Sequence, residues 1–485
     1  MCNLDTVIGV EIHVVVNTRT KMFSPAKNSH VDSPNTNLSP IDLALPGTIP
    51  SVNKEVIVKA IQLAKGLEMK DIDLNLRFDR KNYFYQDLPK GFQITQHYFP
   101  FARNGKIEIT TINGQSKKID VSHFHIEEDT AKQIKLSEQD ILLDFNRAGA
   151  PLFEIVTGPV FSNSSEVQSY LINLRRILLA LNVSDGRMEE GSMRVDVNVS
   201  IKPSGILKLG PKVEIKNINS ILNVVKAIDF EVDRQRKLIF LNKPVKQETR
   251  FFDDKANVTV FMRNKSDAID YRYMTEPNIL CIQLSKKFVK EALDNFPMLP
   301  NQLRRKYRSE NLTDNFIEIL LENPNYQKIL QIIDQNAGNL QESACWLFIE
   351  LFGILNKSKV CITTLKQNVF FQMGILIKRL QEQVINNKQS KKLLQMLVQK
   401  NNDETIDQLI DECGYKQLCD EEFIRSELVE LLNNHTHELT NYSTRPERVE
   451  KFFIGLLMKK NNGAVNPKIS IKILRQLINE HFSAI

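Results

Sequence analysis

The sequence predicts an α+β protein in which a sheet-rich first part with a few helices is followed by a helical remainder. Short runs of β-branched residues alternate with turns up to about residue 294, as strands of a sheet do. After residue 295, apolar residues recur at the i, i+3, i+4 spacing of amphipathic helices. The chain of 485 residues is also longer than one hydrophobic core usually serves, so we expect more than one domain.

The strands come first. They are rich in Val and Ile, and the clearest of them alternate apolar and polar side chains with a period of two. In chain order they are VEIHVVV (10–16), HFHIEED (123–129), PLFEIVTGP (151–159), MRVDVNVSI (193–201) and KVEIKNIN (212–219).

The helical part has two predicted boundaries. The composition changes at 295–308, and the polar stretch 398–408 precedes a smaller helical module. Near the end of that module, Gly463 suits the end of one helix and Pro467 the first turn of the next. The clearest helical spacing lies in residues 315–335, 343–355 and 371–385. We therefore predict domains at 1–294, 295–405 and 406–485.

The composition excludes several classes of protein. No apolar run is long enough to span a bilayer, and no secretory signal opens the chain. The six cysteines form no C-x-x-C pair, which favours reduced thiols over disulfides or a zinc knuckle. The net charge of +6 suits a polyanionic partner, but the Lys, Asn and Ile content of an A/T-rich genome explains it equally well. We expect a soluble cytoplasmic protein that binds neither membranes nor DNA.

Charged residues are built into the predicted strands. The strand period assigns Glu11 and His13 to one face and Ile12 to the other. It groups further polar residues in the same way: Arg194 with Asp196, Asn198 and Ser200; Glu214 with Lys216; and His125 with Glu127, while Glu128 points to the opposite face.

Two interpretations of these carboxylates are open. Those of residues 193–200 are explained by an antiparallel sheet whose outer face meets water. Exposure to water accounts less well for the carboxylates of Glu11 and Glu154, because their sequence neighbours are nearly all apolar and a buried unpaired carboxylate is costly. Carboxylates and imidazoles from several strands would suit a hard cation such as Mg²⁺, which bridges phosphates. This second interpretation predicts phosphoryl transfer.

The common nucleotide-binding loops are absent. Residues 186–192 have the glycine spacing of a P-loop, but Ser192 stands in place of its lysine. No G-x-G-x-x-G follows a strand, and the sequence contains neither a G-x-S-x-G turn nor a Ser-Ser-Lys amidase arrangement. Any ATP site would therefore lie on a sheet surface.

Seven motifs in the sheet-rich part resemble one family. They are RKNYFYQDLPKGFQITQ (80–96), HIEEDTAK (125–132), DFNRAGAPLFEIV (144–156), MEEGSMRVDVNVS (188–200), EIKNINS (214–220), QETR (247–250) and DYRYMTEP (270–277). In sequence and order they are similar to the GatB subunit of the glutamyl-tRNA(Gln)/aspartyl-tRNA(Asn) amidotransferase, in the GatB/GatE family. GAVNPK (463–468) resembles the YqeY-like tail of that family, so the resemblance covers essentially the whole chain.

The resemblance implies both a fold and an activity. The fold is a mixed antiparallel-sheet cradle domain related to glutamine synthetase, followed by an all-α helical domain and a small α-helical, tRNA-binding tail. The activity is that of a glutamine-dependent ligase in translation. It uses Mg²⁺ and ATP to phosphorylate the side-chain carboxylate of Glu-tRNA(Gln) or Asp-tRNA(Asn), and ammonia then displaces the phosphate. In the GatCAB heterotrimer that the resemblance implies, an amidase subunit supplies that ammonia from glutamine, and a small third subunit holds the other two together.

Under this resemblance the ionisable residues acquire expected roles. Glu11, His13, Glu128 and Glu154 are the first candidates for catalysis and Mg²⁺ binding, and Glu127, Glu190 and Glu214 are further candidates, for a second metal. Contacts to phosphate or substrate are expected from Lys81, Lys90, Arg147, Arg194 and Lys216.

The sequence departs from the family at one place. Many members carry four zinc-binding cysteines, where this chain has Ser24, Ala26, Ser39 and Asp42. Ser and Ala do not supply the soft ligands that zinc favours, so we predict no zinc, with this loop held by turn chemistry and packing alone.

Three functions remain to be compared. The first is the ATP-dependent amidotransferase subunit. The second is a tRNA-binding adaptor with a solvated sheet face, and the third is a free-standing ligase that acts on a small acid. The tail favours an RNA substrate, and Glu11, His13, Glu128 and Glu154 favour an active centre.

Overall fold

The computed structural model describes residues 4–29, 33–137, 140–264, 270–415, 420–439, 442, 445–461 and 465–483. Gly463 and its neighbour Ala464, part of the tail motif, lie outside these ranges. Contacts divide the chain into two compact units, Met1–Leu303 and Arg304–Ile485, which are described separately.

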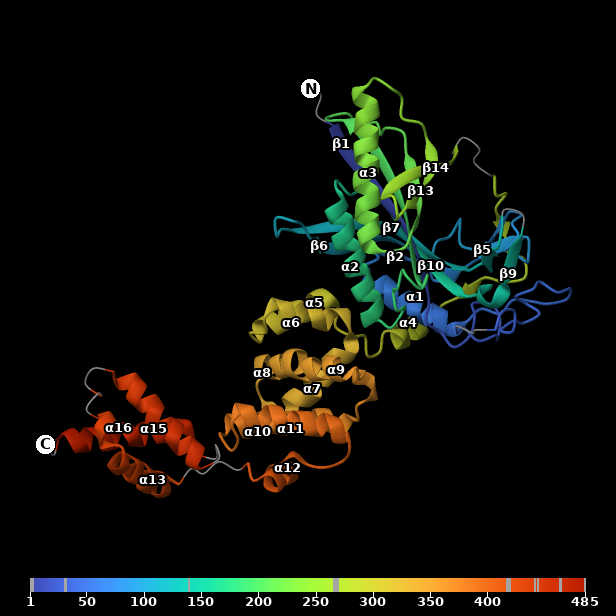
Figure 1. Ribbon diagram of the computed structural model, residues 1–485. Coiled ribbons are helices and arrows are strands. Elements are labelled where there is room, and N and C mark those ends of the chain that lie inside the picture. The colour runs from blue at the N-terminus through green and yellow to red at the C-terminus, as the bar shows by residue number, and fades with distance from the viewer. Residues whose placement is uncertain are drawn as a thin grey trace. The chain divides into compact units, whose positions relative to one another are not determined.

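A nine-stranded mixed sheet forms the centre of the first unit (Figure 1). Its strand order is β14-β13-β12-β11-β1-β10-β7-β6-β2. All neighbouring strands are antiparallel except β12 and β13, which run parallel. The strands are β1 (Leu4–Val15), β2 (Asp71–Ile72), β6 (Ala102–Thr110), β7 (Ser116–Glu128), β10 (Pro151–Thr157), β11 (Met193–Pro203), β12 (Val213–Ile218), β13 (Glu248–Asp253) and β14 (Val258–Asn264).

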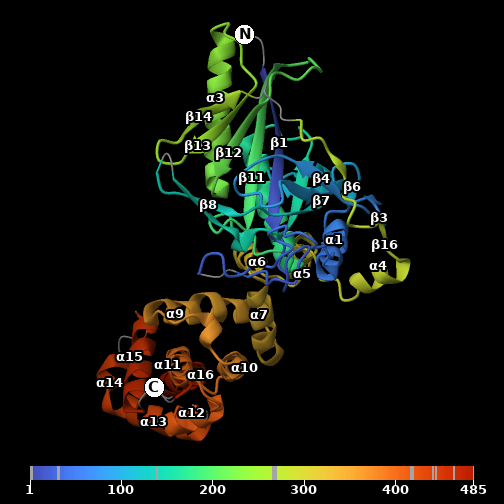
Figure 2. The same ribbon diagram turned by 90° about the vertical axis from the view of Figure 1, so that its right-hand side faces the viewer.

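One face of this sheet is covered by helices. α2 (Ser164–Ala180) packs against β6, and α3 (Ile221–Phe240) packs against β11 and β12, as Figure 2 shows for α3. α1 (Lys54–Gly66) joins the same core. Side chains of Asn53, Asn163 and Ser220 accept hydrogen bonds from the first turns of these three helices, which fixes where each begins. The β1 residues Ile12 and Val14 are fully buried on this side, so the polar residues of β1 point to the other.

Smaller sheets border the main one. β15 (Met274–Thr275), β4 (Asp79–Asn82) and β5 (Phe92–Thr95) form a three-stranded sheet. The guanidinium of Arg80 on β4 donates two hydrogen bonds, of 2.6 and 3.0 Å, to the buried carboxylate of Glu276 just beyond β15. The other small sheets pair β8 (Lys132–Lys135) with β9 (Ile141–Asp144), and β3 (Asn75–Leu76) with β16 (Ile282–Gln283). α4 (Lys286–Ala292) follows.

In its described residues the second unit consists of helices, so the predicted order of a mixed sheet followed by helices is confirmed. Residues 315–335 show one apolar pattern, but the structure divides them at Pro324: α6 (Asp314–Glu322) ends and α7 (Pro324–Ala337) begins, capped by Asn323. Proline has no N–H to continue a helix but suits its first turn. The remaining helices are α5 (Pro300–Ser309), which crosses the boundary, α8 (Leu340–Cys345), a π-helical turn (Trp346–Leu351), α9 (Phe352–Ser358), α10 (Gln367–Gln381), α11 (Asn387–Lys400) and α12 (Ile406–Cys413).

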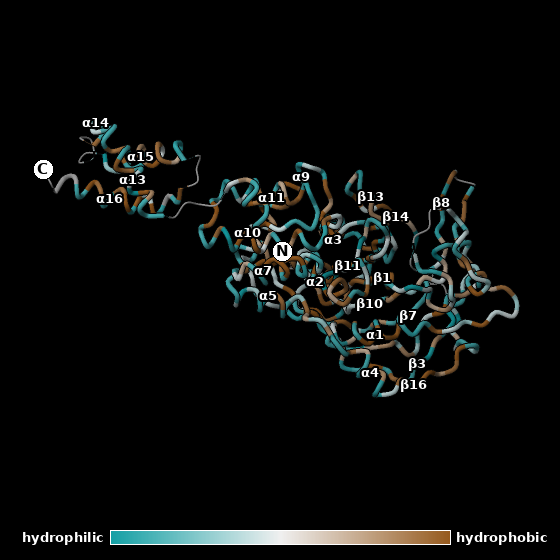
Figure 3. The backbone as a smooth tube through the Cα atoms, turned by 90° about the horizontal axis from the view of Figure 1, so that it is seen from below, coloured by the Kyte–Doolittle hydropathy of each residue, from teal (hydrophilic) through white to brown (hydrophobic). Residues whose placement is uncertain are grey.

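The last helices have a core of their own. α13 (Glu421–Asn434), α15 (Pro446–Lys460) and α16 (Pro467–Ser483) bury Leu428, Phe453 and Leu474 together, and the short α14 (Thr436–Leu439) adds Leu439. Both polar and apolar segments occur along α15 and α16 in Figure 3. Pro467 lies in the first turn of α16, as predicted. None of the helices in the described part of the chain combines the length and the apolar character needed to cross a membrane.

Candidate functional site

The face of the main sheet opposite the helices carries the polar residues of five strands. Strand register brings them together: His13 lies opposite Glu154 on β10 and Arg194 on β11, and Glu154 lies opposite His125 on β7. Farther along, Glu11 lies opposite Asp196, and Asn198 lies opposite Glu214 on β12. Each of these residues occupies the face that the two-residue strand period predicts.

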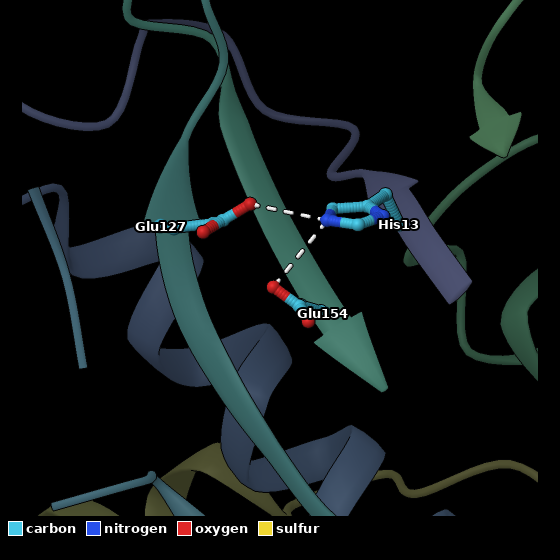
Figure 4. Close-up of side chains that lie close together, drawn as sticks. All are labelled: His13, Glu127 and Glu154. Carbon is cyan, nitrogen blue, oxygen red and sulfur yellow. Dashed lines mark ion pairs between the residues drawn. The ribbon is translucent and has the colours of Figure 1, made fainter. Parts of the chain in front are cut away.

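Two imidazoles and two carboxylates form the first group, which we call the histidine cluster (His13, His125, Glu127 and Glu154). His13 Nε2 lies 3.3 Å from Glu154 Oε2 and 3.5 Å from Glu127 Oε1 (Figure 4). His125 Nε2 lies 3.1 Å from the same Glu154 oxygen and 3.7 Å from Glu127 Oε2. One ligand atom each from His13, Glu127 and Glu154 lies within 4.8 Å of the others, which suits a single small cation.

Charges inside the histidine cluster are strongly coupled. Burial opposes protonation of His125, but Glu154 and Glu127 outweigh it and raise its pKa to about 10. Burial likewise opposes a charge on His13, and Glu154 and Glu127 still raise its pKa. Burial would raise the pKa of Glu154, but His125 and His13 hold it well below its usual value. The two carboxylates therefore favour positive charge at this place, either as a proton on an imidazole or as a bound cation.

A second group, the aspartate cluster, lies on β1, β11 and β12 (Glu11, Asp196, Glu214 and Lys216). The ammonium of Lys216 donates a hydrogen bond to Asp196 Oδ2 and lies 3.6 Å from Glu214 Oε1. Burial lowers the pKa of Lys216, but Asp196 and Glu214 outweigh it, so the pKa is raised. Neighbours orient the carboxylates: Asn198 Nδ2 donates to Glu11 Oε1 at 3.0 Å, and Thr249 Oγ1 on β13 donates to Glu214 Oε2 at 3.0 Å.

The structure separates the adjacent residues Glu127 and Glu128. Glu127 faces His13 and His125, whereas Glu128 points to the other side of β7. There its carboxylate accepts hydrogen bonds of 2.6 and 2.9 Å from the Lys90 ammonium and one of 3.1 Å from the Ile94 N–H. The sequence placed Glu128 among the first metal candidates and Glu127 among the next. The strand pleat brings Glu127, and not Glu128, next to His13 and Glu154. Glu11 likewise belongs to the aspartate cluster and not to the group around His13.

The remaining sequence candidates differ in their surroundings. Arg194 Nη2 donates to Asp129 Oδ2 at 2.8 Å, and Arg147 Nε lies 3.3 Å from the same oxygen. Arg147 also donates to the carbonyl oxygens of Thr130 and Ala131, so it braces the turn after β7. Glu190 is exposed, pairs with Arg187 at 2.5 Å and joins neither cluster.

Lys81, on β4, is the basic candidate with an unpaired charge. Its ammonium makes no hydrogen bond or ion pair with any residue that the structure describes. It lies 4.9 Å from the ring centre of Tyr271 and 5.9 Å from that of Tyr83. Burial lowers its pKa, but Glu127 and then Tyr273 and Glu154 outweigh it and raise the pKa, which favours the charged form. The neighbouring strand β5 reaches the histidine cluster, because Thr95 Oγ1 donates a hydrogen bond of 3.3 Å to Glu127 Oε2.

Several buried polar atoms on this face have no hydrogen-bond partner among the described residues. They are His125 Nδ1, Arg194 Nε, Asn198 Oδ1 and Ser200 Oγ. Such atoms are uncommon in folded proteins, and a group of them on one surface indicates a polar ligand. The carboxylate oxygens and the imidazole nitrogen that converge in the histidine cluster fit a divalent cation and the phosphates that such a cation binds.

Sequence reasoning missed two members of these clusters and one neighbour that orients a member. His125 and Asp196 were assigned to the polar face but not proposed as ligands, and Thr249 was not considered. The strand period that identified Glu11 and His13 also indicates His125 and Asp196. Thr249 could not be found in this way, because only the parallel pairing of β12 with β13 brings it to Glu214.

The loop without cysteines contains an ion pair that the sequence did not predict. The ammonium of Lys21 donates to Asp42 Oδ2 at 3.1 Å and to the carbonyl oxygen of Asn37 at 3.0 Å. Both side chains are almost completely buried. The Ser39 N–H donates to the same Asp42 oxygen at 2.9 Å. The expectation that turn chemistry and packing alone hold this loop is therefore wrong, because Asp42 supplies a charge that Lys21 balances.

Comparisons with known proteins find relatives over nearly the whole chain. A family model described as the GatB/GatE catalytic domain matches residues 6–290, and one described as the GatB domain matches residues 328–478. The GatB subunit of the aspartyl/glutamyl-tRNA(Asn/Gln) amidotransferase of Ureaplasma urealyticum is 44% identical over 480 residues, which is 99% of this chain and all of the relative. The proteins of the same name from Malacoplasma penetrans (98% of each chain) and Mycoplasma genitalium (99% of each chain) are 44% and 40% identical.

Proposed function

The chain belongs to the GatB family of amidotransferase subunits, and we propose that it is the subunit that activates and amidates the amino acid on a mischarged tRNA. The substrate would be Glu-tRNA(Gln), Asp-tRNA(Asn) or both, and the product Gln-tRNA(Gln) or Asn-tRNA(Asn) for translation in the cytoplasm. The observation that carries this proposal is the histidine cluster, in which His13, Glu127 and Glu154 converge from three strands.

The proposed reaction has two steps. A side-chain carboxylate oxygen of the esterified amino acid attacks the γ-phosphorus of ATP, the bond from that phosphorus to the bridging oxygen breaks, and ADP leaves. Ammonia then attacks the acyl carbon, the carbon–oxygen bond to phosphate breaks, and a proton leaves the nitrogen, which gives the amide and inorganic phosphate. Activation is needed because a free carboxylate has no good leaving group, and the protein contributes positioning and charge neutralisation.

The residues divide into roles on this proposal. His13, Glu127 and Glu154 would hold one Mg²⁺, and Glu11, Asp196 and Glu214 a second. Bound Mg²⁺ would neutralise the phosphate charge and orient the transferred group. Lys81 and Arg194, which lies opposite His13, would contact the anions, and Lys216 balances Asp196. Glu128 with Lys90, and Arg147 with Asp129, would position these side chains without touching substrate.

The partners follow from the chemistry that this chain lacks. It has no Ser-Ser-Lys machinery to release ammonia from glutamine, so an amidase subunit would supply ammonia and a small third subunit would hold the two together, as a GatCAB heterotrimer. We propose 1–294 as the catalytic domain, 295–405 as a helical domain and 406–485 as the tRNA-binding tail. We also expect the loop at Ser24, Ala26, Ser39 and Asp42 to bind no zinc, because it offers no thiolate.

The proposal is tested by Glu154→Gln in the reconstituted heterotrimer, with Glu190→Gln as the matched control. Both remove one carboxylate charge, but Glu190 is exposed and lies outside both clusters. We expect ATP hydrolysis that depends on Glu-tRNA(Gln) to fall by at least ~100-fold in Glu154→Gln and to stay close to the unmodified rate in the control. Unchanged hydrolysis in Glu154→Gln would show that the sheet face is merely solvated and that the chain acts as an adaptor.

A further inference from the structure

Five aromatic side chains lie at the ends of β4, β5 and β15 and have no role in the chemistry described above. We call them the aromatic platform: Tyr83, His97, Tyr98, Tyr271 and Tyr273. His97 and Tyr273 stack face to face, with ring centres 3.7 Å apart and planes 5° apart. Tyr271 lies edge-on to Tyr83 and Tyr273 at 5.8 Å from each, and Tyr98 contacts His97 and Tyr273. The rings come from segments after β4, after β5 and before β15, so only folding assembles them.

The platform is held rigidly by the backbone around it. The N–H and side-chain amide of Asn82 donate to the carbonyl oxygens of Tyr271 and Arg272 at 3.0 and 2.7 Å. The Tyr98 hydroxyl donates to the carbonyl oxygen of Tyr273 at 3.2 Å, and the Tyr98 N–H donates to the buried carboxylate of Asp79 at 2.9 Å. Between the two tyrosines, Arg272 has a left-handed backbone with φ of 46°. Such a conformation costs free energy outside glycine and is retained where the surroundings enforce it, often at binding sites.

The platform is not the core of its small sheet. Phe78 and Ile94 are almost completely buried and belong to the main hydrophobic core. By contrast, His97 is exposed and half of the Tyr98 surface meets water. A rigid, partly exposed stack of flat rings is the kind of surface on which nucleobases bind in proteins that take up single-stranded or terminal nucleotides.

Lys81 connects the platform to the histidine cluster. Its ammonium lies against the faces of Tyr271 and Tyr83, and Thr95 on β5, the strand paired with β4, donates a hydrogen bond of 3.3 Å to Glu127 Oε2. A ligand that contacts both the platform rings and the Lys81 ammonium needs a flat aromatic group at one end and a phosphate or carbonyl oxygen at the other. Adenosine derivatives have this form, and both substrates of the proposed reaction contain one: ATP, and the terminal adenosine of tRNA that carries the amino acid.

We propose that the aromatic platform binds the adenine ring of an adenosine-containing substrate by stacking on the His97–Tyr273 pair, with Lys81 directed toward its phosphate or ester end. This inference rests on the proposed function, because that reaction is what brings adenosine to the site. ATP and the tRNA terminus share the chemistry and are distinguished by the kinetics below.

The test uses the reconstituted heterotrimer with Tyr273→Leu and His97→Ala, which remove the stack, and Tyr273→Phe, which keeps it. Phe84→Leu is the matched control, because Phe84 follows Tyr83 of the platform, is 97% exposed and belongs to no ring pair among the described residues. We expect Tyr273→Leu and His97→Ala to raise a substrate KM roughly ten-fold, while Tyr273→Phe and Phe84→Leu leave it within about two-fold. A rise for ATP alone assigns the platform to the nucleotide, and a rise for charged tRNA alone assigns it to the tRNA end.

Inorganic tripolyphosphate with Mg²⁺ is the probe for the phosphate end, since it has no base to stack. Its inhibition constant against ATP should be the same in Tyr273→Leu as in the unmodified heterotrimer. The inference is overturned if both KM values are unchanged, if Tyr273→Phe is as impaired as Tyr273→Leu, or if tripolyphosphate binding weakens in parallel. Failure of the proposed function gives a different result, in which Glu154→Gln retains full activity.

Discussion

His13 on β1 and Glu154 on β10 face each other across an antiparallel strand pair, with His13 Nε2 3.3 Å from Glu154 Oε2. His125 on β7 approaches the same Glu154 oxygen at 3.1 Å, so Glu154 lies between two imidazoles. Three neighbouring strands thus present their polar groups at one place, while the other side of each strand is in the core. If the histidine cluster binds a divalent cation, substitutions and pH changes in this cluster should alter its affinity for that cation.

Glu127→Gln and Glu128→Gln should have different effects, although the two residues are adjacent. Glu127→Gln removes a carboxylate from the histidine cluster, so Mn²⁺ affinity should fall by ~10- to 100-fold. Glu128→Gln removes the partner of the buried Lys90, so it should lower the unfolding midpoint and leave Mn²⁺ affinity nearly unchanged. Mn²⁺ titration followed by electron paramagnetic resonance, with thermal unfolding of the same samples, measures both. If both variants lost Mn²⁺ affinity equally, the face of β7 on which a carboxylate lies would not determine whether it binds the cation.

Mn²⁺ affinity should decrease as the pH is lowered. A cation coordinated by His13 must displace its proton, and Glu154 and Glu127 raise the pKa of His13 above the ordinary 6.5 despite its burial. The loss should therefore begin at a higher pH than for an ordinary imidazole, within a titration series from about pH 6 to about pH 9. In His13→Gln the affinity should be lower throughout and should change less over this range. A pH dependence that is the same with and without His13 would exclude His13 as the ligand that releases the proton.

Thr249→Val should weaken the aspartate cluster through Glu214. The hydroxyl of Thr249 donates to Glu214 Oε2, and loss of a group that orients a ligand lowers metal affinity by ~10-fold or more. One of two Mn²⁺ binding steps should weaken, and the other should stay unchanged. Thr249→Ser keeps the hydroxyl and should restore the lost affinity, whereas a purely structural role for the β-branched side chain would leave Thr249→Ser as impaired as Thr249→Val.

Lys21→Met should destabilise the first unit. It leaves Asp42 as a buried carboxylate without its cation, which costs about 3–5 kcal/mol for a pair buried to this extent. The double variant Lys21→Met with Asp42→Asn removes both charges and should regain part of that loss. Lys400→Met is the control, because its pair with Glu404 is largely in water and should contribute little. Urea unfolding followed by circular dichroism measures all three, and a Lys21→Met midpoint equal to that of the control would contradict the assignment.

Strand faces could be predicted because the period of two is a local property of extended chain. Glu11, His13 and Asp196 all point to the polar side for this reason, and Ile12 and Val14 to the core. The break between α6 and α7 was open to the same kind of reasoning, since Pro324 cannot donate within a helix. The apolar spacing continues on both sides of Pro324, so the pattern alone predicts one helix, whereas the proline itself indicates the boundary.

Which residues meet across strands is not a local property. The sequence determined the α+β class, the polar face and the residues on it, because these depend on composition and on spacing along the chain. Only the tertiary structure decided that Glu127 and not Glu128 meets His13, that Glu11 belongs with Asp196 and Glu214, and that Thr249 reaches Glu214. The same is true of the buried Lys21–Asp42 pair and of the aromatic platform. The physical reason is that strand register and loop closure join segments far apart in the sequence, and a one-residue shift of register would bring different side chains together.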